Sequence, residues 1–287
     1  MGNYDFDSAV IGGGSAGYAT ARTTAAAGKR TVIIEAGGEL GGLCILRGCM
    51  PTKALLHAAD VRHQARRSSI WGLKPDEVSF DFAAVMRRKA AMVEEFASYR
   101  RGQLQDGRFE LIRALARFRD PHTLELDNGK AVTAEHIMIC TGSRVAELPL
   151  PGLTKLGCIT SDDALRLESL PKSIIVLGGG AVALEFAQFF ARFDVEVTLL
   201  QRSPHILKAF DDDGAGEVEA AFRAEGITVH TGCSLMDARH DGNEKMVVYE
   251  RDGVQHEVRA EAVFHGLGRS PNTGSLALEN GGVETER

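Results

Sequence analysis

Short apolar runs alternate with helical patterns along the chain and predict its secondary structure. Residues 7–11 form one such run and predict a buried strand. A glycine-rich turn and an alanine-rich helical pattern follow through Ala27, and Gly28 predicts the end of that helix. A second apolar run at residues 31–34 predicts a second strand, which ends at Glu35. Strand, turn, helix and strand in this order predict a parallel α/β unit.

The turn of this unit has the glycine spacing of a dinucleotide-binding site. Gly12 would make the turn, Gly14 would let the backbone approach a pyrophosphate, and Gly17 would let helix and strand pack closely. Ser15 lies inside the same turn. Glu35 stands where an acid accepts a hydrogen bond from a ribose hydroxyl. Because the strands, glycines, helix and acid are in register, we expect a nucleotide cofactor here.

The same unit occurs a second time. Residues 173–177 and 195–200 predict two strands that flank a second glycine turn and a helical pattern. The positions that correspond to Gly12, Gly14, Gly17 and Glu35 are Gly178, Gly180, Ala183 and Gln201. Alanine is an accepted third residue of the fingerprint. The chain therefore predicts two Rossmann-like domains of the α/β class with parallel sheets.

The end of the second unit differs from the first in charge. Gln201 replaces the acid, Arg202 follows it, and His205 and Lys208 lie nearby. An acid at this position would repel the 2′-phosphate of NADP, whereas a nearby arginine accommodates it. We expect NADPH in preference to NADH. The alternative, in which Arg202 is an ordinary surface residue and NADH binds, stays open.

The segment between the two units predicts helices and then short strands. Residues 54–105 have largely helical patterns, and residues 111–118, 123–126 and 136–139 predict strands. The sequence Asp127-Asn128-Gly129 is typical of a hairpin turn. Pro149 to Gly152 marks the expected domain boundary.

Composition and charge exclude some classes of function. The 287 residues suffice for about two domains, and 44% hydrophobic and 25% charged residues are ordinary for a globular protein. The net charge of −6 gives no support to nucleic-acid binding. No apolar run has the length of a membrane span, and acids stand where a signal peptide has bases, so we expect a cytoplasmic protein. Basic clusters at Arg62 to Arg67, Arg87-Arg88-Lys89 and Arg100-Arg101 predict solvated helix faces.

Two cysteines five positions apart are the candidate reactive groups. Cys44 and Cys49 flank Gly48 and follow Gly41-Gly42. A regular helix would hold them too far apart for a disulfide, at about 7.5 Å of rise and about 140° of rotation. Glycine tolerates a distorted turn, so the spacing predicts a strained, reducible bridge. Two buried free cysteines remain the alternative. A zinc site lacks a second ligand pair, and no metal site is predicted.

Two nucleotide sites and a reducible disulfide together predict an electron relay. Nicotinamide carries hydride, and a flavin can pass two electrons to a disulfide. Because the cysteines follow the first unit, we expect FAD there and NADP(H) in the second unit. The expected domains are residues 1–150, an FAD-binding domain with the cysteine pair; residues 151–273, an NAD(P)H-binding domain; and residues 274–287, the start of a link back to the first.

Residues 41–53 resemble a known active-disulfide motif. They read Gly-Gly-Leu-Cys-Ile-Leu-Arg-Gly-Cys-Met-Pro-Thr-Lys, which is similar to the motif of the class I pyridine nucleotide-disulfide oxidoreductases. That family includes dihydrolipoamide dehydrogenase, glutathione reductase and mercuric reductase. Cys140-Thr141-Gly142-Ser143 resembles the segment that closes the first FAD-binding stretch, with Cys140 in place of alanine. Residues 266–273 look like the motif that ends the nicotinamide domain.

The resemblance implies a role for each matching residue. Cys44 would be the interchange thiol that attacks substrate, and Cys49 the thiolate that faces the flavin. Lys53 would lie near the flavin ring and Glu185 would pair with it, and a cation near Cys49 would favour its thiolate. The residues expected to bind cofactors are Gly12, Gly14, Ser15, Gly17, Glu35, Gly42, Lys53, Thr141, Gly142, Ser143, Gly178, Gly180, Ala183, Gln201, Arg202 and Gly268.

The chain departs from the family pattern at its C-terminus. In the family a second FAD segment and a dimerisation domain follow the nicotinamide domain, and the sequence reaches Arg287 before either. The chain therefore looks truncated, and we expect weak FAD binding and a homodimer only for the full-length protein. The family's catalytic base is a histidine followed by proline, and none of the nine histidines here has a proline after it.

These observations favour an FAD-dependent NAD(P)H:disulfide oxidoreductase similar to dihydrolipoamide dehydrogenase. The substrate would be a small-molecule or protein disulfide, and lipoamide, glutathione-like and mercuric substrates all stay open. One alternative is a nucleotide-binding or regulatory fragment that lacks catalysis, and another is a metal reductase similar to mercuric reductase. A thioredoxin reductase type ranks last, because that group has a C-x2-C pair in its nicotinamide domain.

Overall fold

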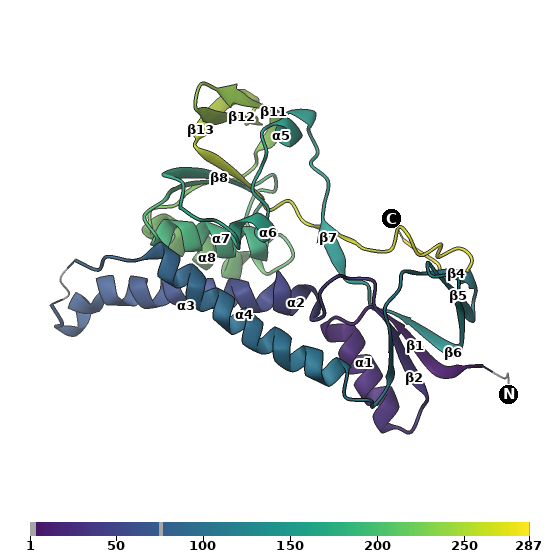
Figure 1. Cartoon of the computed structure of the whole chain (residues 1–287). Helices are drawn as coiled ribbons and strands as arrows, with labels where there is room; N and C mark the ends of the chain where they lie inside the picture. The colour runs from purple at the N-terminus through teal and green to yellow at the C-terminus, as the bar shows by residue number, and fades with distance from the viewer. Residues whose placement is uncertain (1–3, 75–76, 287) are drawn as a thin grey trace. The chain divides into compact units, whose positions relative to one another are not determined.

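A computed structural model describes residues 4–74 and 77–286 of the chain (Figure 1). The chain forms two compact units. Unit 1 comprises Met1–Pro51, Ala91–Arg144 and Arg269–Arg287, and unit 2 comprises Thr52–Ala90 and Val145–Gly268. The α/β class and the Rossmann-like units predicted from the sequence are confirmed. Within the described residues, no helix has the length and apolar character needed to cross a membrane.

Unit 1 is built on a six-stranded sheet with the order β3-β2-β1-β6-β5-β4. The first four strands are parallel, and β5 and β4 continue the sheet in antiparallel pairing. Helix α1 connects β1 to β2 and packs on both strands (Figure 1). The elements are β1 (Phe6–Ile11), α1 (Ser15–Ala26), β2 (Thr31–Ile34), β3 (Glu110–Ile112), β4 (Ala116–Asp120), β5 (Thr123–Leu126) and β6 (Ala131–Ile139).

The predicted turns of unit 1 are confirmed. Helix α1 ends at Ala26, and Gly28 has a φ of +76°, where a residue without a β-carbon is favoured. The hairpin between β5 and β6 is closed by Gly129, with a φ of +82°, and by a hydrogen bond from the Lys130 amide to the Asn128 side chain of 3.1 Å. These local signals act within a few residues, so the sequence alone suffices to find them.

The predicted strand at residues 111–118 is wrong as one element. The chain forms β3 beside β2 and then β4 beside β5, with a break at residues 113–115. At the break the Arg113 side chain donates to the Gly38 carbonyl at 3.1 Å, and the Leu115 amide donates to the Asp127 carboxylate at 3.0 Å. A single straight strand could not pair with two different neighbours, so the chain bends between them.

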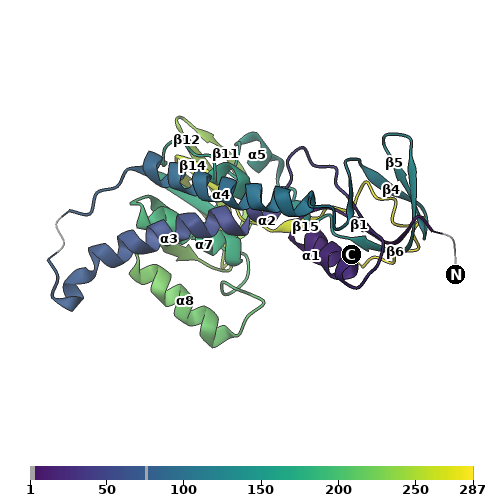
Figure 2. The same ribbon diagram turned by 60° about the horizontal axis from the view of Figure 1, so that its bottom comes forward.

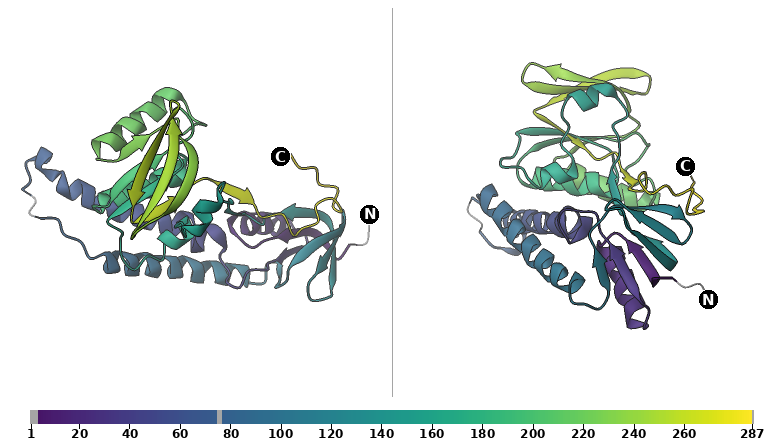
Figure 3. Two further views of the ribbon diagram at one scale, coloured as in Figure 1. Left: turned by 90° about the horizontal axis from the view of Figure 1, so that it is seen from above. Right: turned by 45° about the vertical axis from the view of Figure 1, so that its right-hand side comes forward.

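Unit 2 contains a four-stranded parallel sheet with the order β10-β9-β8-β14. Helices α7 and α8 connect its first strands, and an antiparallel sheet of β11, β12 and β13 follows β10 (Figure 3, yellow-green strands). The elements are α5 (Pro151–Lys155), α6 (Ser161–Ala164), β8 (Ser173–Leu177), α7 (Ala181–Arg192), β9 (Glu196–Leu200), α8 (Asp212–Ala224), β10 (Thr228–His230), β11 (Ser234–Asp241), β12 (Glu244–Arg251), β13 (Val254–Ala260) and β14 (Ala262–His265).

The remaining elements are two short strands and a helical segment. The short strands β7 (Ser143–Val145) and β15 (Arg269–Pro271) form a two-stranded sheet. The helical segment contains α2 (Gly42–Leu46), α3 (Cys49–Arg66), the 3-10 turn η1 (Ser68–Trp71) and α4 (Phe82–Leu104). Residues 52–90 belong to unit 2 by their contacts, although they precede the expected boundary near residue 150.

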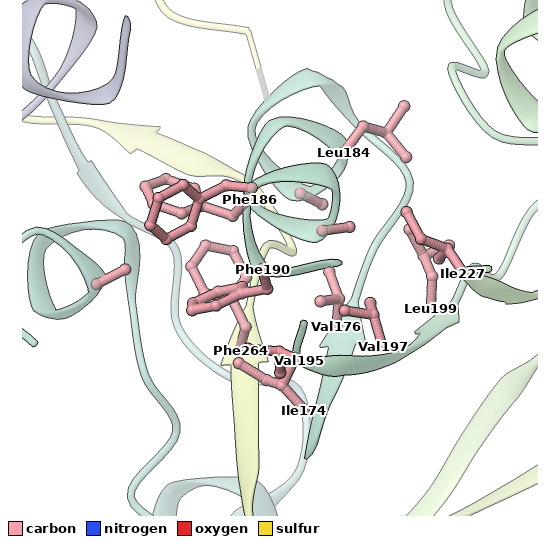
Figure 4. Close-up of a cluster of buried hydrophobic side chains, with 14 of the residues drawn as sticks. Ile174, Val176, Leu184, Phe186, Phe190, Val195, Val197, Leu199, Ile227 and Phe264 are labelled. Carbon is pink, nitrogen blue, oxygen red and sulfur yellow. The ribbon is translucent and has the colours of Figure 1, made fainter. Parts of the chain in front are cut away.

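The core of unit 2 is a cluster of phenylalanines from α7 and β14. Phe186, Phe190 and Phe264 are almost fully buried, and they pack over the apolar side chains of β8 and β9 (Figure 4). The Phe186 and Phe264 ring centroids are 4.9 Å apart. Leu55 and Ala59 of α3 join the same cluster, so the part of α3 that belongs to unit 2 is anchored against α7 (Figure 2).

A network of charged side chains also joins α3 to α7. Arg192, the last residue of α7, forms two hydrogen bonds of 2.8 Å with the Glu225 carboxylate and an ion pair with Asp60 of α3. The Glu225 side chain is 12% exposed. Burial raises the pKa of Glu225, but hydrogen bonding and the charge of Arg192 outweigh it, so the pKa of this carboxyl is lowered.

The phenylalanine cluster predicts a large cost for truncation. We expect Phe190→Ala to lower the free energy of unfolding of unit 2 by about 3–5 kcal/mol, because a cavity remains where the ring was. Urea denaturation followed by circular dichroism measures the change. Val182→Ala, at an exposed position of the same helix, is the control and should change little. A loss of less than about 1 kcal/mol for Phe190→Ala would contradict this packing.

The Arg192–Glu225 pair predicts a pH-dependent effect. A carboxyl with a lowered pKa stabilises the fold above its unfolded-state value, about 4.3, and this contribution is lost as pH falls through the folded-state value. We expect Glu225→Gln to cost about 1.5–3 kcal/mol at pH 7. The difference from the wild type should shrink only below about pH 4.3.

Urea denaturation at a series of pH values tests this prediction. Glu219→Gln is the control, because Glu219 pairs with Arg223 within one turn of α8 and such i,i+4 pairs contribute little. A Glu225→Gln penalty that stays constant down to pH 3 would show that the charge of Glu225 is not what stabilises the contact.

Candidate active site

Two close backbone contacts shape the first glycine turn. Gly12 has a φ of +103°, and a β-carbon there would overlap the Cys140 carbonyl oxygen. A β-carbon on Gly17 would overlap the Gly12 carbonyl oxygen, so α1 can pack on β1 only with glycine at this position. Gly14 is the N-cap of α1 and forms no side-chain cap. The first N–H groups of the helix, with Ser15 exposed, can therefore bind an anion.

Glu35 lies at the end of β2 and is held by backbone N–H groups. Its two carboxylate oxygens accept hydrogen bonds of 2.6 Å from the amides of Gly13 and Gly37. The carboxylate is thus oriented beside the glycine turn. Each oxygen keeps a lone pair with which it can accept a further hydrogen bond.

The second glycine turn repeats this geometry in unit 2. Gly178 has a φ of +105°, and a β-carbon there would lie 2.5 Å from the Gly266 carbonyl oxygen. Gly180 is the N-cap of α7, again without a side-chain cap, and a β-carbon on it would meet no atom within 4 Å. Ala183 is fully buried and packs against Gly266. The open space beside Gly180 lies at a helix N-terminus that can bind a phosphate.

The end of β9 presents basic side chains. The Gln201 side chain donates to the His205 carbonyl at 3.4 Å, while Arg202 and Lys208 are exposed. Within the described residues, neither Arg202 nor Lys208 forms an ion pair. His205 lies 3.2 Å from the Asp212 carboxylate. Arg202 and Lys208 are therefore the cations available to a negatively charged ligand here.

The cysteine pair occupies a break between two helices. Cys44 lies in α2, and Cys49 begins α3. A β-carbon on Gly48 would lie 2.9 Å from the Leu43 carbonyl oxygen and 3.2 Å from the Cys44 Cα, so glycine lets the chain turn back toward Cys44. The predicted distortion at Gly48 is confirmed. Cys44 is half-buried and Cys49 exposed, and the structure does not join their sulfurs in a disulfide, so the bridge itself stays a prediction.

A second close approach fixes α2 against the first glycine turn. Gly42 has a φ of +73°, and a β-carbon there would overlap the Gly14 Cα. Since Gly42 begins α2, this contact holds Cys44 near the N-terminus of α1. Unit 1 therefore brings the cysteine-bearing segment and the predicted FAD turn together.

Lys53 and Glu185 form an ion pair in unit 2. Lys53 lies one helical turn after Cys49, on the same face of α3. The resemblance to the family implies this pairing. Their side chains are 60% and 30% exposed, so the pair is accessible to solvent and to ligands. Among the residues that the structure describes, no cluster of His, Cys, Asp or Glu could hold a metal ion.

The other predicted cofactor residues lie near β7 and β15. The Gly142 carbonyl accepts a hydrogen bond of 3.0 Å from the Asn272 amide, and the Ser143 hydroxyl accepts one of 2.8 Å from the Arg269 guanidinium. Thr141 immediately precedes them. In unit 2 the Gly268 carbonyl accepts from the Ala146 amide at 3.1 Å. These hydrogen bonds fix the two segments that resemble family motifs, residues 140–143 and 266–273.

Comparison with known proteins identifies the family. The model of the pyridine nucleotide-disulphide oxidoreductases matches residues 6–287. The chain belongs to this family. The resemblance inferred from the cysteine motif is confirmed, and the family match covers both glycine turns and the cysteine pair.

Relatives with known names and structures support this family assignment. A mercuric reductase of Bacillus cereus is 34% identical over 99% of this chain and 45% of its own length. A dihydrolipoyl dehydrogenase of Geobacillus stearothermophilus is 34% identical over 96% of this chain and 59% of its own length. The structure of the HOCl-induced flavoprotein disulfide reductase RclA from Escherichia coli matches 98% of this chain and 60% of its own, with 30% identity and a TM-score of 0.81. The chain thus spans about half the length of these relatives.

Two arginines differ from the sequence expectation. The basic clusters predicted solvated faces, yet Arg62 is only 8% exposed and pairs with Asp194 at 2.5 Å. Arg100 is half-buried, with its guanidinium carbon 4.0 Å from the centre of the Tyr18 ring. Both positions look polar in the sequence, and only tertiary contacts show their burial. The sequence reasoning therefore missed the burial of Arg100 beside Tyr18.

Proposed function

We propose that the chain is part of an FAD-dependent NAD(P)H:disulfide oxidoreductase. The observation that supports this best is the contact of Gly42 with Gly14, which places the cysteine-bearing helix α2 against the first glycine turn. A redox-active thiol pair and a dinucleotide turn then share one site. The RclA structures, described as flavoprotein disulfide reductases, support the same chemistry.

The residues of the two turns fit the proposed cofactors. Turn 12–17 offers uncapped helix N–H groups to a pyrophosphate, and Glu35 offers its remaining lone pairs to a ribose hydroxyl. Turn 178–183 offers the same groups and the open space beside Gly180. When bound, a flavin would supply the step between hydride from NAD(P)H and the two electrons that open a disulfide.

The two cysteines have different roles in the proposed thiol chemistry. Cys49 is the proposed thiolate beside the flavin, and Lys53, one turn further along α3, supplies a cation that favours the anionic sulfur. Glu185 holds the Lys53 ammonium in place through the ion pair. Cys44 is the proposed interchange thiol, which attacks one sulfur of the substrate disulfide and displaces the other as a thiolate.

The proposed substrate is a disulfide of a small molecule or a protein. Dihydrolipoyl dehydrogenases and mercuric reductases occur among the relatives at equal identity, so a metal-ion substrate is the second candidate. The cytoplasmic location and the homodimer of the full-length protein stay predictions.

The first test is the visible spectrum of the purified chain with FAD. Under anaerobic titration with NADPH we expect a long-wavelength band from a thiolate beside the flavin. The band should disappear in Cys49→Ser, because that sulfur faces the flavin in the proposal, and persist in Cys44→Ser. Cys233→Ser is the matched control, since Cys233 is buried in another core. A band that survives in Cys49→Ser would refute the assigned roles.

We further propose that the second turn prefers NADPH to NADH. Support comes from the exposed Arg202 and Lys208 after β9 and from the neutral Gln201 where the first unit has Glu35. A guanidinium can donate two hydrogen bonds to a phosphate, and an acid at Gln201 would repel that phosphate.

Nicotinamide affinities test this preference without turnover. We expect Arg202→Gln to weaken NADPH binding about tenfold and leave NADH binding nearly unchanged, because only NADPH has the 2′-phosphate. Gln201→Glu should also weaken NADPH binding. Arg259→Gln, on the exposed strand β13, is the control. Equal losses for both nucleotides in Arg202→Gln would show that the arginine does not distinguish them.

A further inference from the structure

Arg100 lies half-buried beside Tyr18 in unit 1. Its guanidinium carbon is 4.0 Å from the centre of the Tyr18 ring, and Tyr18 itself is only 5% exposed. The Arg108 side chain donates to the Tyr18 hydroxyl at 3.3 Å. The Nε of Arg100 donates to the Gln103 side chain at 3.1 Å. These contacts hold the guanidinium in one place on α4.

One end of this guanidinium has no partner. Nη1 of Arg100 is shielded from solvent, and within the described residues it forms no hydrogen bond. Buried charged donors are normally paired, because removal from water costs several kcal/mol. Arg100 also forms no ion pair with a carboxylate in that part of the chain, unlike its neighbour Arg101, which pairs with Glu39 at 3.8 Å. The arrangement contains a fixed positive charge without a resident anion.

Cys44, in helix α2 of the same unit, is the sulfur that can supply this anion. Residue 101 pairs with Glu39, and Leu104 packs in one buried cluster with Leu40 and Tyr18, so this turn of α4 lies against the chain that leads into α2. Helix α2 also contacts α1, which carries Tyr18.

The charged and titratable groups around Arg100 are few. Burial lowers the pKa of Arg100, charges at Tyr18 and Cys44 act to raise it, and the Arg22 charge lowers it further. Tyr99 of α4 acts weakly in the raising direction. A tyrosine titrates at about pH 10 and a cysteine at about pH 8.5, so a thiol is the group that can become anionic nearer to neutral pH.

We propose that Arg100 is a positioning residue that supplies the counter-charge for the sulfur anion of Cys44. Reduction of the proposed disulfide adds two electrons from NAD(P)H, breaks the S–S bond and leaves an anion on each sulfur, while the proton of the NAD(P)H hydride passes to solvent. In the proposed function Lys53 supplies the counter-charge for the Cys49 sulfur, and Arg100 supplies it for the Cys44 sulfur. The substrate then meets a nucleophilic thiolate at Cys44.

Alkylation of the reduced chain tests this without cofactor or substrate. Iodoacetamide is neutral and reports the thiolate, whereas iodoacetate is an anion and also responds to a nearby positive charge. Cleavage after arginine and lysine separates the two cysteines, because peptide 31–47 contains Cys44 and peptide 48–53 contains Cys49. Mass spectrometry then gives a rate for each sulfur, with Cys49 as the internal reference.

We expect Arg100→Met to slow iodoacetamide modification of Cys44 about fivefold at pH 7, through loss of one nearby charge. Modification of Cys44 by iodoacetate should slow more than modification by iodoacetamide. The pH at which the Cys44 rate is half-maximal should rise. Arg100→Lys should retain most of both rates. Arg101→Met, which removes a paired arginine from the same turn, should leave both unchanged.

Three outcomes would overturn the inference. Unchanged Cys44 rates in Arg100→Met would show that the charge does not act on the sulfur. Loss of iodoacetate reactivity alone would show that Arg100 attracts external anions instead. Equal slowing of Cys44 alkylation in Arg100→Met and Arg100→Lys, or equal slowing of Cys44 and Cys49 in Arg100→Met, would indicate a structural effect. The inference rests on the proposed function, but a missing flavin band would reject the proposed relay through FAD and Cys49 and leave the Cys44 alkylation rates intact, so the two failures are distinguishable.

Discussion

The close approach of backbone to backbone at the first glycine turn is the constraint on which the site depends. A β-carbon on Gly17 would collide with the Gly12 carbonyl, and one on Gly42 would collide with Gly14. Because Gly17 has no β-carbon, α1 can pack on β1, and because Gly42 has none, α2 can pack on the turn. A ligand bound at the N-terminus of α1 and a thiol on α2 are thus held in one place by steric fit, which depends little on pH or salt.

The second unit uses the same steric device with different charges. Gly178 approaches the Gly266 carbonyl as Gly12 approaches the Cys140 carbonyl, and both helices begin without a side-chain cap. What differs is the end of the neighbouring strand, where Glu35 has its carboxylate bound to amides and Gln201 is neutral with Arg202 beside it. Shape therefore defines a dinucleotide site, and a few side chains after the strand can select which dinucleotide binds.

Local signals made most of the fold and much of the site predictable. The strands at 31–34 and 173–177 agree with the structure to the residue, because each run ends at charged residues or at a glycine, which leaves little freedom in its bounds. The strand at 111–118 was wrong, since its break depends on contacts with Gly38 and Asp127, distant in sequence. The burial of Arg62 was missed for the same reason. A polar position on a helix predicts exposure unless another segment covers it, and composition contains no information on that cover.

Comparison of Arg62 with Arg100 shows why one is structural and the other points to function. Arg62 donates to Asp194, to the Val78 carbonyl and to the Arg192 carbonyl, and it lies over Phe80, so its charge and donors are satisfied. Arg100 has an aromatic face and one amide oxygen, with Nη1 unpaired. Stacking on an aromatic ring compensates only part of the lost hydration of a guanidinium. A folded chain tolerates such a deficit where an anion forms during the working cycle, and reduction of the proposed disulfide would create one at Cys44.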